Sequence, residues 1–119
     1  MKCLYCERKT FEKTINEKMI FSDYPNDFVA PLNVINCYKC GEVYTKCKEL
    51  QKWEKLISDQ IVKAQNPTKD MFKFVRKTYG ISKKDIASND IKVLKRFFTM
   101  DTLHVFRWLM ENRKNIEEQ

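Results

Sequence analysis

Residues 36–44, NCYKCGEVY, contain two cysteines, Cys37 and Cys40, that are separated by two residues and followed at once by a glycine. The first residues of the chain, MKCLYCE at 1–7, repeat this spacing with Cys3 and Cys6. Two intervening residues allow one tight turn to present both sulfurs to the same ion, and two such turns supply the four thiolates of a closed tetrahedral zinc site. The pattern Cys-x2-Cys-x30-Cys-x2-Cys therefore predicts one structural Zn²⁺ bound by Cys3, Cys6, Cys37 and Cys40.

The segment between the two cysteine pairs indicates how they can meet. Residues 10–21, TFEKTINEKMIF, and residues 27–36, DFVAPLNVIN, read as two extended runs, and the turn-forming residues YPND at 24–27 separate them. A hairpin of this length brings its two ends together. We therefore expect a β-hairpin with both cysteine pairs at its base.

Other uses of the cysteines fit the sequence less well. A redox site needs only one Cys-x2-Cys pair in a strand-to-helix context, and two disulfides need an oxidising compartment that nothing here signals. A catalytic zinc keeps an open position beside a histidine or carboxylate, but His104, the only histidine, is distant in the sequence. Four thiolates also suit iron, and a closed structural site favours zinc. Cys47, the fifth cysteine, is interpreted as a buried or free thiol and not as a further ligand.

Length and charge narrow the class of protein. With 119 residues the chain is one domain or two very small ones, and its net charge of +7 favours contact with a polyanion. No apolar run approaches the roughly 20 residues that span a bilayer, and the N-terminal residues lack the apolar region of a signal peptide. We therefore expect a cytoplasmic protein with no membrane partner, in which the cysteines stay reduced.

From Thr45 onward the apolar residues recur every three to four positions, which is typical of helices. Leu50, Trp53 and Ile61 predict an amphipathic helix over 45–64, and QNPT at 65–68 is a short linker. Further helices are expected over 68–80, 82–87, 90–98 and 101–114, with a turn at 99–102 and a frayed tail at 115–119. The predicted fold class is α+β, with a β-hairpin zinc domain at 1–48, a connecting helix at 49–65 and an all-α helix-turn-helix domain at 66–119.

The helical half is the more basic one, because residues 66–119 hold 12 Lys and Arg residues against 7 Asp and Glu residues. This charge is either an ordinary solvated surface or a face that contacts phosphates around a helix-turn-helix. In the second interpretation the crossing of two short helices is sealed by Leu94, Phe98, Met100, Val105 and Trp108. The residues that then face outward are Asp101, Thr102, Leu103, Phe106 and Arg107. Leu103 and Phe106 are unusually apolar for a reading face, and they either touch thymine methyl groups or are buried in a dimer contact.

Three stretches together resemble a known arrangement: MKCLYC at 1–6, VINCYKCGEVY at 34–44 and FKFVRKTYGISKKDIA at 72–87. They are similar to the MqsA-type antitoxins, in which a YgiT-type zinc finger precedes a helix-turn-helix. The resemblance covers nearly the whole chain, and its four cysteines match the family's zinc ligands one for one. It implies a homodimer formed through the C-terminal domain, binding to palindromic operators in double-stranded DNA and, in some members, neutralisation of a partner toxin. Arg107, in FRWL at 106–109, matches the arginine of the family's recognition helix.

The helical half departs from the family pattern at several positions. Lys95 and Thr99 stand where a helix-turn-helix usually has a small residue and a glycine. Relative to the family, Leu103 and Leu109 replace an asparagine and a glutamate. Residues 88–97, SNDIKVLKRF, are extra relative to the compact pattern. Either the motif is displaced by a helix, or the domain has diverged.

Two functions from different classes are therefore expected. In the first, the protein is a DNA-binding transcriptional regulator and autorepressor: Arg107 contacts bases, Thr102 and His104 make weaker or backbone contacts, and the phosphates are held by Lys83, Lys84 and Arg96. In the second, it is a zinc-containing protein-interaction module, with weak or lost DNA binding, that uses the hairpin or the surface around Leu103 and Phe106. An enzyme is not expected, because the sequence contains no phosphate-binding loop, nucleophile elbow or recognisable carboxylate pair.

Overall fold

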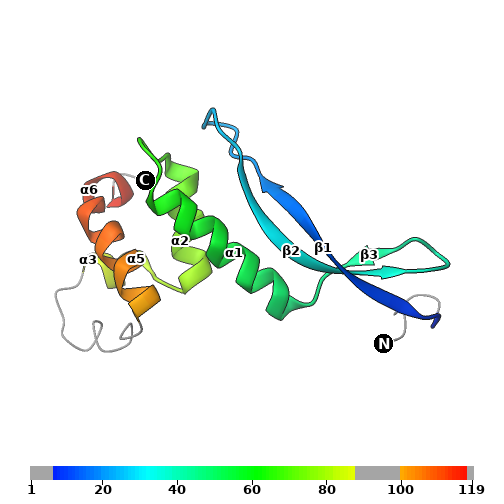
Figure 1. Cartoon of the computed structure of the whole chain (residues 1–119). Coiled ribbons are helices and arrows are strands. Elements are labelled where there is room, and N and C mark those ends of the chain that lie inside the picture. Colours follow the sequence, from blue (N-terminus) through cyan, green and yellow to red (C-terminus); the bar gives the residue numbers. More distant parts are fainter. Residues whose placement is uncertain (1–6, 88–99, 118–119) are drawn as a thin grey trace.

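The computed structural model describes residues 7–87 and 100–117 and forms an antiparallel sheet followed by short helices (Figure 1). The strands are β1 (Thr10–Met19), β2 (Phe28–Cys37) and β3 (Val43–Tyr44), in the order β1-β2-β3. The long hairpin pairs Thr10 with Cys37 at its base and Met19 with Phe28 near its turn. The predicted hairpin is therefore confirmed, whereas the two residues of β3 are too few to produce a sequence pattern.

The sheet buries one face, because alternate residues of a strand point to opposite sides. Along β2 the buried residues of this face are Phe28, Ala30, Leu32 and Val34. Helix α1 (Cys47–Val62) packs against β2 and buries Trp53, Ile57 and Ile61, which confirms the amphipathic helix that their spacing predicts. Residues 63–66 then form a turn and bends, and residues 67 and 68 have no regular structure, as expected for the linker around Pro67.

Helix α2 (Lys69–Tyr79) begins and ends at the predicted residues. Thr68 is its N-cap, and its hydroxyl donates a hydrogen bond of 3.0 Å to the Asp23 carboxylate in the hairpin turn. Gly80 ends the helix in the left-handed conformation, with a φ of 64°, which glycine adopts without steric cost. The Phe21 and Phe74 rings lie 5.8 Å apart, so the tip of the hairpin packs directly on α2.

The C-terminal helices are α3 (Lys83–Ala87), α5 (Met100–Glu111) and α6 (Arg113–Glu117). Ser82 and Asp85 cap α3 reciprocally, with N–H to oxygen distances of 3.0 and 3.1 Å. Two expectations are wrong here. Met100, which was assigned to a turn before the last helix, is already part of α5, and residues 115–117 are helical and not frayed, because Ile116 is fully buried. The helix expected over 90–98 lies outside the described residues.

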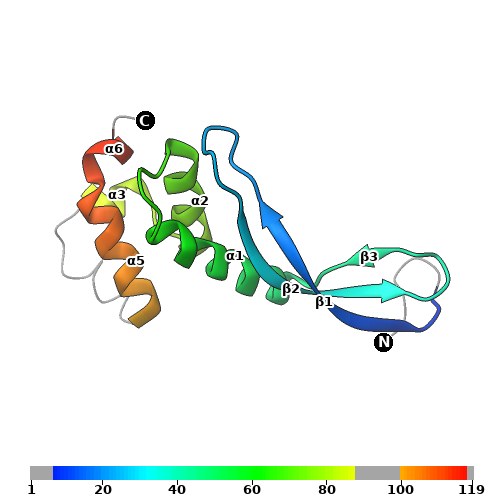
Figure 2. The ribbon, with the colours of Figure 1, turned by 45° about the horizontal axis from the view of Figure 1, so that its top comes forward.

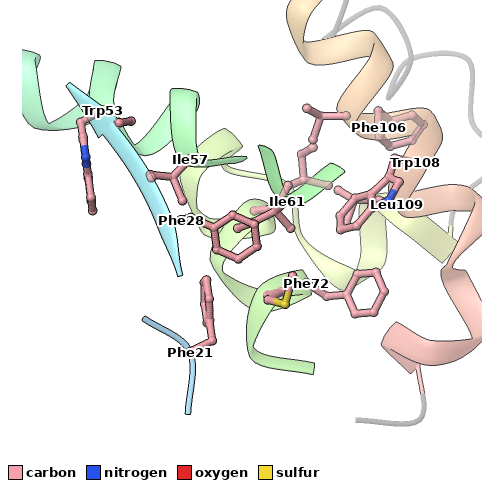
Figure 3. Close-up of a cluster of buried hydrophobic side chains, with 14 of the residues drawn as sticks. Phe21, Phe28, Trp53, Ile57, Ile61, Phe72, Phe106, Trp108 and Leu109 are labelled. Atoms are coloured by element: carbon pink, nitrogen blue, oxygen red, sulfur yellow. The ribbon is translucent and has the colours of Figure 1, made fainter. Parts of the chain in front are cut away.

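One apolar core joins the sheet to the helices (Figure 3). Side chains of the hairpin tip meet side chains of α1 and α2, and the cluster continues through α5 to Ile116 in α6. The Phe72 and Trp108 rings, 5.0 Å apart, connect α2 to α5. The chain is thus an α+β protein whose hairpin extends away from the helices at its cysteine end (Figures 1 and 2). In the described part of the chain, no helix has the length and apolar character that crossing a bilayer requires.

Candidate metal centre and candidate nucleic-acid interface

The second cysteine pair has the local geometry of a metal-binding turn. Cys37 is the last residue of β2 and is buried, while Cys40 is exposed. The Cys40 N–H donates to Cys37 Sγ at 3.5 Å, and the Cys37 N–H donates to the Glu42 carbonyl at 3.0 Å. Backbone N–H groups directed at a sulfur stabilise its thiolate form, which is the form that binds a metal. Gly41 completes the turn with a φ of 71°.

The hairpin brings Lys9, near the beginning of the described residues, next to this turn. The Tyr38 N–H donates to the Lys9 carbonyl at 3.4 Å, which continues the β1–β2 pairing one residue beyond Thr10 and Cys37. Glu7, the residue after Cys6, has a φ of 59°. It therefore repeats the left-handed conformation that Gly41 adopts after Cys40. A glutamate gives no sequence signal for this conformation, because positive φ is uncommon outside glycine, asparagine and aspartate.

The zinc site remains a prediction. Cys3 and Cys6 lie outside the described residues, and within those residues no three His, Cys, Asp or Glu side chains gather closely enough to hold a metal ion. The geometry around Cys37 and Cys40 fits half of a closed tetrathiolate site, in which the metal would be structural. Cys47, the first residue of α1, is exposed. Of its two predicted alternatives, the buried thiol is therefore wrong, and the free thiol agrees with the structure.

The buried side of α5 is wider than the sequence predicts. Val105 and Trp108 are buried, as expected for residues that seal a helix crossing. Phe106, which was expected to face outward, is only 3% exposed, and Leu103 is half-buried. The reason is that α5 packs against α1, α2, α3 and α6, so that these neighbours cover more than one stripe of its surface. Leu109 is likewise fully buried.

The outer side of α5 is polar and carries two of the predicted DNA-contacting residues. His104 and Arg107 are exposed, and Thr102 is half-buried. His104 Nε2 lies 3.4 Å from Asp59 Oδ1 of α1, but the two atoms are not aligned for a hydrogen bond. The contact is therefore electrostatic, and it requires a protonated histidine. The acidic side chain beside His104 makes Arg107 the better positioned of the two for an anionic ligand.

The predicted phosphate contacts are on a neighbouring element. Lys83 and Lys84 are exposed on α3, which packs against α5. Arg96 and the sealing residues Leu94 and Phe98 lie outside the described residues.

A cleft of about 380 Å³ between α1 and α2 lies beside His104. Two further basic residues, Lys52 and Lys55, line this cleft, and Lys55 Nζ lies 5.9 Å from the centre of the Tyr79 ring. Sequence analysis missed these two lysines, because they belong to the polar face that the amphipathic helix α1 exposes to solvent.

An apolar patch at the cysteine end of the sheet was also missed. Phe11, Tyr38 and Val43 are 36%, 70% and 53% exposed, and the Phe11 and Tyr38 rings lie 4.5 Å apart. Asn36 of β2 pairs with both Phe11 and Val43, which places these two residues in one row across the sheet. The patch lies on the face that α1 covers elsewhere, but beyond the beginning of that helix.

Comparison with protein-family models, with curated proteins and with solved structures finds no significant match to this chain. What the chain binds must therefore be inferred from its own residues and their geometry.

Proposed function

We propose that the protein is a DNA-binding transcriptional regulator, an autorepressor of the antitoxin type, that reads a palindromic operator as a homodimer formed through its helical part. The observation that carries this proposal is the exposed Arg107 on a helix that is anchored on its opposite side. Val105 and Leu109 are fully buried and Trp108 is 9% exposed, so α5 is held in a fixed orientation. A rigid helix that presents an arginine suits the major groove, where arginine donates two hydrogen bonds to guanine.

The surrounding charge supports the same proposal. Lys83 and Lys84 on α3 would neutralise phosphates beside the groove that α5 enters. Such contacts release counterions, so affinity should fall steeply with added salt. Asp59 would repel nearby phosphates, and we therefore assign base contact to Arg107 and only a minor role to His104 and Thr102.

The metal has a structural role in this proposal. Cys3, Cys6, Cys37 and Cys40 would hold one Zn²⁺ in a closed site, which joins the two ends of the hairpin without touching DNA. Zinc is favoured over iron by this closed character. The hairpin would then present a rigid surface at the end opposite to its tip.

The test uses the metal-loaded full chain and DNA from the region upstream of its own coding sequence. Arg107→Ala should weaken binding by about 10- to 100-fold, because one bidentate arginine–guanine contact is worth about 1–3 kcal/mol. Arg113→Ala, at an exposed arginine of α6, is the matched control and should leave affinity nearly unchanged. Equal effects of the two changes would contradict the assignment of α5 as the reading helix.

A second function is favoured by the apolar patch of Phe11, Tyr38 and Val43. Monomeric surfaces rarely expose several large apolar side chains together, and such patches often bind other proteins. The protein would then be a zinc-stabilised interaction module whose hairpin grips a partner such as a toxin. The other surface that the sequence predicts for binding a partner protein, around Leu103 and Phe106, is less suitable, because Phe106 is buried. Insensitivity of partner binding to salt would distinguish this function from DNA binding.

A further inference from the structure

The two outer edges of the sheet differ. The N–H of Tyr38 donates to the Lys9 carbonyl, so the odd-numbered residues of β1 are those whose backbone groups face β2. Alternation then directs the N–H and C=O groups of the even-numbered residues away from the sheet. Glu12, Thr14, Asn16 and Lys18 therefore form an outer backbone edge. Among the described residues no strand pairs with this edge, because β1 is the first strand in the sheet order.

The opposite edge, along β2 beyond β3, is closed by the chain itself. The Gln60 side chain donates to the Val29 carbonyl at 2.7 Å, and the Thr45 hydroxyl donates to the Asn33 carbonyl at 2.9 Å. Pro31 stands between these two residues and has no N–H to offer. An edge satisfied in this way cannot accept another strand. The contrast singles out β1 as the edge that remains available.

The sequence of β1 is complementary to itself when read in the opposite direction. In an antiparallel pair of two β1 strands that is centred on Ile15, Glu12 lies opposite Lys18 and Lys13 lies opposite Glu17. Ile15 meets its own counterpart, and Phe11 meets Met19. All four side chains Glu12, Lys13, Glu17 and Lys18 are exposed, and none forms an ion pair within the part of the chain that the structure describes.

We propose that the outer edge of β1 pairs with the same edge of a second copy of this chain, in the antiparallel register centred on Ile15. The backbone groups then match, because Glu12 faces Lys18 and Thr14 faces Asn16, and these are the residues whose N–H and C=O groups point outward. Pairs of this kind exchange both hydrogen bonds. Ile15 lies at a non-hydrogen-bonded position, where facing side chains approach most closely. The two sheets become one continuous sheet around a two-fold axis.

Neighbouring registers lack this match. Centring on Thr14 places Phe11 opposite Glu17 and Lys13 opposite Ile15, and centring on Asn16 places Ile15 opposite Glu17 and Lys13 opposite Met19. Charged residues commonly protect a strand edge against association. Here, however, the register that places Ile15 opposite Ile15 of the second copy also forms both pairs of opposite charges. A charge pattern that only protects the edge would not need to match in this way.

The fold leaves room for the second copy. Helix α1 packs on β2, and β1 lies on the side of β2 that faces away from α1 in both views (Figures 1 and 2). A two-fold axis perpendicular to the sheet keeps the α1 helices of both copies on the same face. The helical parts remain at the outer ends, so this contact is separate from any contact between them and goes beyond the proposed function.

The test is the dissociation constant for self-association of the zinc-loaded full chain, measured by sedimentation without DNA. Lys13→Glu places two carboxylates opposite each other at positions 13 and 17, and Glu17→Lys places two ammonium groups there. Because of the two-fold axis, each such pair occurs twice in the dimer. Each change should weaken association by about tenfold or more. The double variant Lys13→Glu/Glu17→Lys exchanges the charges and should restore the original affinity. An equimolar mixture of the two single variants should likewise associate with restored affinity.

Lys73→Glu, at an exposed lysine of α2, changes the net charge equally and should have no comparable effect. The circular dichroism spectra of all variants should match that of the unchanged chain, since the altered side chains are exposed. The proposal is overturned if the unchanged chain is monomeric at high concentration. It is also overturned if Lys13→Glu has no more effect than Lys73→Glu, or if the double variant stays as weak as the single ones.

Discussion

Two backbone positions beside the predicted zinc ligands share an unusual conformation. Gly41 follows one cysteine pair with a φ of 71°, and Glu7 follows the other with a φ of 59°. Glycine adopts this conformation readily, whereas a residue with a side chain is strained there by about 1–3 kcal/mol. The positive φ at both places means that the chain bends in a similar way after each cysteine pair.

Cysteine substitutions test this site directly. Cys37→Ser should abolish stoichiometric zinc binding and lower the thermal stability of the hairpin, because a closed tetrathiolate site depends on every ligand. Cys47→Ser, which removes an exposed cysteine at the start of α1, should retain one zinc per chain. The measurement is the zinc released to a chromogenic chelator after denaturation. Equal zinc content in the two variants would exclude Cys37 as a ligand.

Among the elements, the sequence predicts the limits of α2 correctly, but it does not predict where α5 begins or which of its residues are buried. The limits of α2 follow from Thr68 and Gly80, whose chemistry acts locally, and the structure places the helix between them. The start of α5 at Met100 and the burial of Phe106 follow instead from packing against four other helices. Local patterns do not contain that information. The two cysteine spacings were equally local signals, whereas the Glu7 conformation and the apolar patch around Tyr38 depend on the folded hairpin.

The end of α2 offers a test at this scale. Gly80→Ala should lower the free energy of unfolding by about 1–2 kcal/mol, because an alanine in the left-handed conformation is disfavoured. No atom lies within 4 Å of a Cβ added there, so backbone strain is the only cost. Lys77→Ala, at an exposed position of the same helix, should change stability by less than about 0.5 kcal/mol. Urea unfolding measures both, and indistinguishable effects would argue against the cap.

For the whole molecule, the two ends of the hairpin have different surroundings. Its cysteine end extends away from the helices, while its tip packs on α2 through Phe21 and Phe74 (Figure 1). The predicted boundaries after residues 48 and 65 lie near the two ends of α1. The buried cluster nevertheless runs across both of them, from the sheet to α6. Sequence periodicity indicated which side of each element is buried, but not that these sides share one core.

A single core predicts cooperative unfolding. Phe21→Ala should destabilise the protein by about 3–5 kcal/mol, because a buried phenyl ring is lost between the hairpin and α2. The strand and helix signals in circular dichroism should then disappear in one thermal transition. Ile20→Ala, at a neighbouring residue that is 66% exposed, should have little effect. Two separate transitions would show that the sheet and the helices fold independently.

The proposed function requires that α5, together with Lys83 and Lys84 of α3, recognises one DNA sequence. The most direct measurement compares the affinity of the metal-loaded chain for its own upstream DNA with that for a scrambled duplex of the same length and composition, at two salt concentrations. We predict a preference of about a thousandfold or more for the upstream DNA, together with a steep loss of affinity for both duplexes as salt increases. Equal affinity for the two duplexes, or binding that does not respond to salt, would contradict the proposed function.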